Sequence, residues 1–240
     1  MAQMKGRFDT ERGVFYDDAR KRMRLKLLKF LVGLLLLPVC LAALPTVGRV
    51  LQGSGRADTV WVALGAGALA WVVVFLLLPK PMLMYVFGHE LTHALWTWAF
   101  GGRVKKFKAT SKGGHVIISK SNFIIALAPY FFPLYAAMVI LLYVVCDLIW
   151  GLQEYRAVFH LLLGAAYAFH VTLTVHILQT KQTDITEQGW LFSFVVIWLG
   201  NVAVLIMGIP LLTGHRGMLS ALGIWGVETG KLLQRLGQLF

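Results

Sequence analysis

Hydrophobic residues along this chain are gathered into long blocks, separated by short polar or basic segments. Each block is about as long as the roughly 20 apolar residues that cross a bilayer as a helix. The blocks cover residues 25–47, 59–79, 81–100, 122–146, 156–178 and 189–212. No segment between them is long enough for a soluble domain. The pattern therefore predicts an all-α polytopic membrane protein with about six transmembrane helices.

Polar segments flank the apolar blocks at both ends, and they divide the chain into three parts. Residues 1–24 are a basic N-terminal segment, residues 25–213 the transmembrane domain, and residues 214–240 a C-terminal helix. From Met218 onward, apolar residues are interspersed with Lys231 and Arg235. This mixture is typical of an amphipathic helix on a membrane surface, and docking on a partner is the alternative. The first apolar run exceeds the hydrophobic region of a cleavable signal, so we interpret it as a retained signal-anchor.

Charge is the next constraint, because the 240 residues are 58% hydrophobic and yet carry a net charge of +12. The positive charge is concentrated beside the membrane, in residues 1–29 and in the acid-free loop 101–121. This distribution argues against nucleic-acid binding and predicts contact with anionic membrane lipid. Basic clusters mark the cytoplasmic side, yet three predicted spans separate these two, so the orientation stays open. We expect a multi-pass protein of a bacterial-type cytoplasmic membrane; nothing in the sequence indicates an oligomeric state.

One ionisable motif, His89-Glu90-Leu91-Thr92-His93, interrupts the third apolar block. Inserting a charged residue at the middle of a membrane costs roughly 2.5–3.5 kcal/mol, so a charged residue there indicates a functional role. Residues four apart share a helix face, and His89 and His93 can therefore bind one Zn²⁺. Glu90, about 100° away around the helix, is then the catalytic base for a zinc-activated water. The alternative is a chance match whose histidines are hydrogen-bonded core residues.

A third metal ligand must come from elsewhere, since catalytic zinc usually takes three protein ligands. Trp96 and Ala99 exclude the extended metzincin motif, and residues 94–146 contain no acid for a thermolysin-like ligand. Among the later acids, Asp184 lies in a polar break and is expected on the same face as the motif. The alternatives are that Asp184 only caps the sixth helix, or that His176 is the ligand.

The motifs of this chain resemble those of the site-2 protease family of intramembrane zinc metalloproteases. The resemblance covers about residues 81–200, from Gly88-His-Glu-Leu-Thr-His-Ala94 through Phe100-Gly-Gly-Arg-Val-Lys-Lys-Phe107 and Gly113-Gly-His-Val116 to Ala126-Leu-Ala-Pro129. It implies a short re-entrant β-hairpin after the zinc-motif helix and a transmembrane protein or peptide as substrate. The family's Leu-Asp-Gly is replaced by Thr-Asp-Ile around Asp184, as in a variant branch.

Within the implied hairpin, the residues from Gly114 to Ile117 become candidates for substrate binding. Val116 and Ile117 belong to a strand whose edge could bind an extended substrate segment, although the hairpin could equally be a passive plug. Gly114 permits close approach. His115 and Asn122 are candidates for stabilising the oxyanion.

A second function of another class also fits the motif. A transporter or scaffold without catalytic activity could use the His/Glu cluster to bind protons or an ion. A transporter is expected to show paired broken helices in two halves, and the sequence shows only one broken segment.

Overall fold

The computed structural model describes residues 2–54, 58–214 and 217–238, with side chains except those of residues 2–20, 22 and 58. The chain is 81% helical, which confirms the all-α class. Its elements are α1 (Ala2–Gln52), α2 (Asp58–Leu77), α3 (Met82–Ala99), β1 (Val104–Thr110), β2 (Gly113–Ile118), α4 (Phe123–Leu127), α5 (Leu134–Trp150), α6 (Arg156–Leu178), α7 (Thr183–Gln188), α8 (Trp190–Thr213) and α9 (Met218–Gly237). Single 3-10 turns, Ala128–Tyr130 and Leu152–Tyr155, lie before and after α5.

Long apolar helices identify a membrane protein. In the described part of the chain, four segments are long and apolar enough to cross a bilayer: Met23–Gln52, Thr59–Leu77, Leu152–Leu178 and Trp190–Thr213. A fifth is added if Phe123–Tyr130 and Leu134–Trp150, bent by 80°, count as one span. Exposed leucines such as Leu35, Leu77 and Leu148 suit contact with lipid.

The predicted number of six spans is not reached, because α3 is not among these helices. This helix has 18 residues, but it is not apolar enough, because several of them are polar, including His89, Glu90 and His93. Its burial reflects this composition, since Glu90, Thr92, His93 and Thr97 are buried inside the protein. The third apolar block therefore forms a helix whose polar side chains face other parts of the protein.

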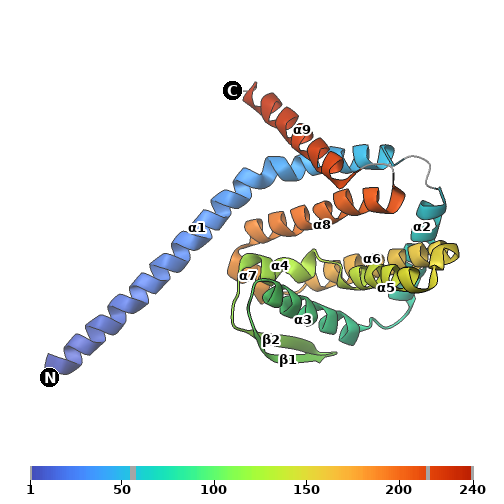
Figure 1. The fold of residues 1–240 in the computed structure, drawn as a ribbon. Helices are drawn as coiled ribbons and strands as arrows, with labels where there is room; N and C mark the ends of the chain where they lie inside the picture. Colours follow the sequence, from blue (N-terminus) through green and yellow to red (C-terminus); the bar gives the residue numbers. More distant parts are fainter. Residues whose placement is uncertain (1, 55–57, 215–216, 239–240) are drawn as a thin grey trace.

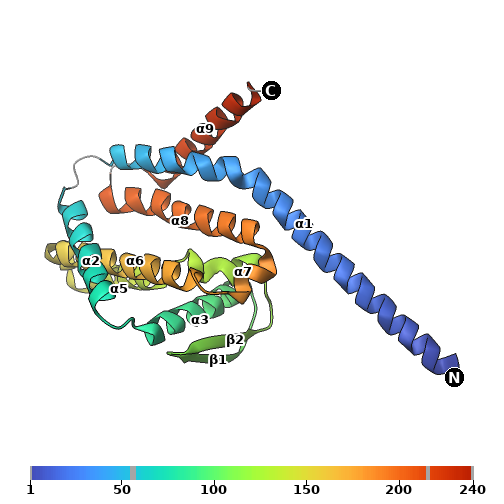
Figure 2. The ribbon, with the colours of Figure 1, turned by 180° about the vertical axis from the view of Figure 1, so that it is seen from behind.

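The helices are arranged in successive layers (Figures 1 and 2). Helix α9 and the C-terminal part of α1 lie on one side of α8, followed by α5 and α6, then by α3, and finally by the hairpin. The N-terminal part of α1 extends away from the other helices in both views. The expected boundary between residues 24 and 25 falls inside this single helix.

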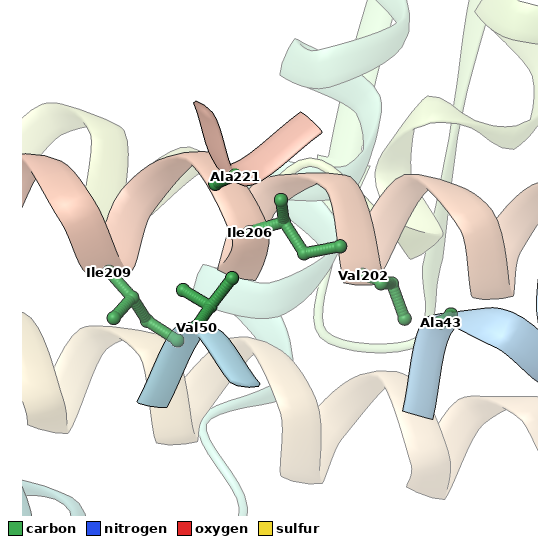
Figure 3. Packing of buried hydrophobic residues seen from close by; sticks show 6 residues of the cluster. All are labelled: Ala43, Val50, Val202, Ile206, Ile209 and Ala221. Carbon is green, nitrogen blue, oxygen red and sulfur yellow. The ribbon is translucent and has the colours of Figure 1, made fainter. Parts of the chain in front are cut away.

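Helices α1, α8 and α9 pack through a cluster of small and branched aliphatic side chains, shown in Figure 3: Ala43, Val50, Val202, Ile206, Ile209 and Ala221. The indole N–H groups of Trp198 and Trp225 donate to the carbonyl oxygens of Cys40 and Val39 in α1. Buried Glu228 of α9 pairs with Arg49 of α1 at 3.2 Å. The expected C-terminal helix is thus present, and it is docked on α1 and α8; residues 215, 216, 239 and 240 of the predicted segment lie outside the described residues.

Helices α2 and α6 approach each other closely, and glycine makes this possible. A β-carbon on Gly67 would collide with the Leu161 carbonyl oxygen, and one on Gly164 with that of Leu64. Small residues at such crossings are the usual means of packing membrane helices. The indole of Trp71 also donates to Thr172 across the pair at 2.8 Å. This packing fixes α6, which lines one side of the site described below.

The hairpin implied by the family resemblance is present. Strands β1 and β2 pair antiparallel, with Phe107 opposite Val116 and Lys108 opposite His115. The hairpin lies along α3, below it in Figure 1. It therefore places β2 beside the helix that carries the His-Glu-x-x-His motif.

Candidate metal centre

Helix α3 presents the two histidines of the motif on one face, as the four-residue spacing predicts. The rings of His89 and His93 have centroids 4.9 Å apart and are nearly perpendicular. Their side chains are only 11% and 9% exposed. Two imidazoles are therefore held together inside the protein.

Asp184 meets the two histidines from another part of the chain. Its Oδ2 atom lies 3.5 Å from His89 Nε2 and 3.6 Å from His93 Nε2. One potential ligand atom from each of the three residues lies within 4.8 Å of the others. Asp184 comes from α7, which lies with α3 and α4 at one end of the helical layers (Figure 1).

The structure distinguishes between Asp184 as a metal ligand, Asp184 as a helix cap and His176 as the ligand. The N-caps of α7 and α8 are Gln182 and Gly189, so Asp184 caps neither helix. His176 does not belong to the three-residue group; its ring makes an edge contact with Phe75. Of the two candidate third ligands, the structure brings only Asp184 to the histidine pair.

A backbone carbonyl orients His93. Its Nδ1 lies 2.8 Å from the carbonyl oxygen of Ile125 in α4. A carbonyl only accepts, so Nδ1 carries the proton, and in the neutral ring the lone pair of Nε2 can bind a metal ion beside Asp184. The local fold places this carbonyl, because the Asn122 side chain caps α4 by accepting from Ile125 N at 2.8 Å. Asn122 therefore has a structural role in addition to its predicted one.

A tyrosine orients Asp184. The hydroxyl of fully buried Tyr130 donates to Asp184 Oδ2 at 3.0 Å. The Asn201 amide of α8 in turn donates to the Tyr130 carbonyl oxygen at 3.0 Å. Burial raises the pKa of the Asp184 carboxyl, but when His89 and His93 are protonated, their hydrogen bonds and charge outweigh burial and hold that pKa below its ordinary value. The carboxylate is thus favoured at the position where a cation would bind.

Glu90 lies between the motif helix and the hairpin. Its side chain is buried, and a β-carbon placed on Gly114 of β2 would lie 2.8 Å from Glu90 Cγ. The strand approaches the helix this closely because residue 114 has no side chain. The candidate base and the candidate substrate strand are therefore direct neighbours.

The other predicted substrate-binding residues lie further along the same strand. Ile117 and His115 are exposed, whereas Val116 is partly buried opposite Phe107. Their contacts in the structure identify no ligand, so their roles remain predictions.

The chemistry of the donor set fits a metal ion. Two imidazole nitrogens and one carboxylate oxygen are ligands that Zn²⁺ accepts, and three of them leave a fourth position for water or substrate. The group His89, His93 and Asp184 could therefore hold a metal ion. It is the only such group among the residues that the structure describes.

Sequence reasoning did not identify Tyr130, Asn201 or the Ile125 carbonyl. The two side chains had a visible signal, because each is a polar residue inside an apolar block. A backbone carbonyl has no such signal. Whether the Ile125 carbonyl meets His93 depends on the position of α4 relative to α3.

Comparisons with known protein families, curated proteins and solved structures find no match for this chain. The resemblance to site-2 proteases consequently rests on the motifs of the sequence.

Proposed function

We propose that this protein is an intramembrane zinc metalloprotease of the site-2 protease type, which hydrolyses peptide bonds of membrane-embedded substrates. The observation that carries the proposal is the meeting of His89 and His93 with Asp184, next to buried Glu90, in a chain of membrane-spanning helices. Catalytic zinc sites use three such ligands, and the glutamate that follows the first histidine is the usual base.

Each side chain of the centre has a distinct task in this proposal. His89, His93 and Asp184 hold the zinc ion, and Tyr130 keeps the Asp184 carboxylate oriented toward the histidines. Bound zinc supplies an acidified water and polarises the peptide carbonyl. Glu90 accepts the proton from the attacking water on its carboxylate and passes it to the leaving amine.

The substrate would bind as an extended segment along the hairpin. A helix in a membrane has its backbone groups paired internally, so it must unwind before a peptide bond is exposed. The edge of β2 between Gly114 and Ile117 offers backbone hydrogen bonds to such a segment. Support comes from the contact between Gly114 and Glu90, which puts this strand beside the base. His115 and Asn122 remain candidates for contacts with the oxyanion.

We place the protein in a bacterial-type cytoplasmic membrane, with anionic lipid at its basic segments. The lysines of β1 support contact with lipid headgroups, since Lys105, Lys106 and Lys108 are exposed. Such clusters attract anionic headgroups within about a Debye length.

The test compares Glu90→Gln with the wild-type chain in lipid vesicles. Zinc content is measured in the purified proteins, and cleavage of co-reconstituted single-span peptides is followed by mass spectrometry. We expect the wild type to bind zinc and cleave, and Glu90→Gln to keep zinc while cleavage falls by about 10²–10⁴-fold. Glu154→Gln, the same change at an exposed residue of the Leu152–Tyr155 turn, is the matched control.

Two outcomes would contradict the proposal. Cleavage by Glu90→Gln at the wild-type rate would show that Glu90 is not the base. Zinc binding by a wild type that cleaves none of the peptides would favour the alternative of a non-proteolytic ion-binding protein.

A further inference from the structure

The two histidines of the centre differ in what their second ring nitrogen contacts. His93 Nδ1 donates to the Ile125 carbonyl, but His89 Nδ1 is buried and has no hydrogen-bond partner among the described protein atoms. Metal-binding histidines almost always donate this N–H to an acceptor, which fixes the tautomer and the ring orientation. An acceptor for His89 is therefore expected close by.

His89 lines a small cavity between α3, α5, α6 and the Ala128–Tyr130 turn. Its walls are mostly apolar and include Phe132, Tyr135 and Phe169. The cavity has a volume of about 20 Å³, and roughly 10–15 Å³ suffices for one water molecule. A water there also needs two to four polar partners.

The same cavity contains two further polar groups without well-formed hydrogen bonds. His170 of α6 and Tyr85 of α3 both line it, and the two residues are only 7% and 6% exposed. Neither His170 Nε2 nor Tyr85 Oη makes a well-formed hydrogen bond to the described protein atoms, although Asn201 lies beside His170 and Thr174 beside Tyr85. Leaving such groups unpaired costs about 1–3 kcal/mol each, so the three together favour a shared polar ligand.

We propose that a water molecule in this cavity accepts the N–H of His89 Nδ1 and is held there by His170 and Tyr85. His170 is then a positioning residue: it touches neither metal nor substrate, but through the water it keeps the lone pair of His89 Nε2 directed at Asp184. The water donates one hydrogen to His170 Nε2, and the Tyr85 hydroxyl completes its coordination. The inference rests on the metal centre proposed above and is independent of the reaction catalysed there.

The experiment measures Zn²⁺ affinity of the full chain in detergent micelles by competition with a chromogenic chelator. Loss of an outer-shell partner costs about 10–100-fold in metal affinity, and we expect that range for His170→Leu. His170→Gln, which keeps a hydrogen-bonding group, should restore most of the affinity. The matched control is His160→Leu, because His160 is also buried in α6 but does not line the cavity.

Two additional measurements separate positioning from a structural role. The visible spectrum of the Co²⁺-substituted protein reports ligand geometry, and it should change in His170→Leu and return toward wild type in His170→Gln. Tyr85→Phe removes one oxygen atom only, so a smaller loss of Zn²⁺ affinity in that variant tests the proposal even where His170→Leu does not fold.

Wild-type Zn²⁺ affinity in both His170→Leu and Tyr85→Phe would overturn the inference. Equal losses in His170→Leu and His170→Gln, with an unchanged Co²⁺ spectrum, would also overturn it, because packing alone would then explain the effect. Failure of the wild type to bind Zn²⁺ would refute the metal centre together with this role. Reduced affinity in a protein that cleaves no peptide would refute proteolysis and leave the role of His170 standing.

Discussion

Buried polar groups differ between two regions of the molecule. One region runs from α3 to α7 and contains the candidate centre, and the other is the layer formed by α1, α8 and α9. In the described part of the chain, six buried side-chain atoms have no hydrogen-bond partner, and all belong to α3, α5 or α6: Tyr85 Oη, His89 Nδ1, Thr97 Oγ1, Asp147 Oδ1, His170 Nε2 and Thr174 Oγ1. In the α1–α8–α9 layer, buried Thr46 donates to the Ala42 carbonyl, Ser193 to the Ile185 carbonyl, and Glu228 is paired with Arg49.

This contrast indicates that one region of the membrane domain binds a ligand and the other stabilises the fold. Unpartnered polar groups are costly in a low-dielectric interior, and they are expected where a ligand, a metal or water completes them. The layer of α1, α8 and α9, by contrast, is held by aliphatic packing (Figure 3). Substitutions in the region of the candidate centre should therefore affect metal binding, and those in the α1–α8–α9 layer should affect stability.

The largest effect is expected for Asp184→Ala. Loss of a metal ligand should lower Zn²⁺ affinity by more than the roughly 10–100-fold that an outer-shell partner contributes. Asp184→Asn should also weaken binding, because a neutral amide is a poorer ligand than a carboxylate. Zinc content after dialysis against a chelator measures both variants. Full zinc content and full cleavage in Asp184→Asn would exclude Asp184 as a ligand.

The next largest effect is expected for Ile206→Ala, in the α1–α8–α9 layer. Ile206 is completely buried in the α1–α8–α9 cluster, and its truncation should lower the free energy of unfolding by about 2 kcal/mol, near the low end for buried aliphatic residues. Zinc affinity should remain that of the wild type. Leu211→Ala on the same helix, where the residue is 67% exposed, serves as the control. A parallel loss of zinc would mean that the two regions are not separable.

A smaller effect is expected for Tyr130→Phe. The ring stays in place while the hydrogen bond to Asp184 is lost, so Zn²⁺ affinity should fall by about 10-fold. Tyr143→Phe is the matched control, since its hydroxyl bonds to the Leu152 carbonyl away from the centre. Equal Zn²⁺ affinities for the two variants would show that Tyr130 does not orient the carboxylate.

The smallest effect concerns the hairpin. A β-carbon on Gly114 would lie 2.7 Å from the Lys108 carbonyl oxygen of β1 and 2.8 Å from Glu90 Cγ, so Gly114→Ala must shift the hairpin or the Glu90 side chain. If the displaced strand loses about 1 kcal/mol of transition-state stabilisation, peptide cleavage becomes roughly fivefold slower. Zinc content should not change. Gly226→Ala, whose β-carbon would meet nothing within 4 Å, is the control, and equal cleavage rates would argue for a passive hairpin.

Local patterns along the chain were sufficient for the helical class, the motif helix and the pairing of His89 with His93. Helix periodicity alone determines that residues four apart share a face. Elimination of the other acidic residues also predicted Asp184 as a ligand. In the structure Asp184 lies beside His89, although the two residues are far apart in the sequence. The amphipathic C-terminal helix followed from its mixed composition, whereas the hairpin was implied only by the family resemblance.

Tertiary structure decided the features that depend on how distant helices pack. The apolar block at 81–100 suggested a span, but α3 packs against α4 and the hairpin, and its histidines meet Asp184 of α7. The hydropathy of one segment carries no information about such partners. Tyr130 reaches Asp184 across 54 residues, and the Ile125 carbonyl reaches His93 across 32. The cavity shared by His89 and His170 likewise exists only because α6 is held against the rest of the bundle. Sequence periodicity specifies the face of one helix, and only the packing of several helices determines what that face meets.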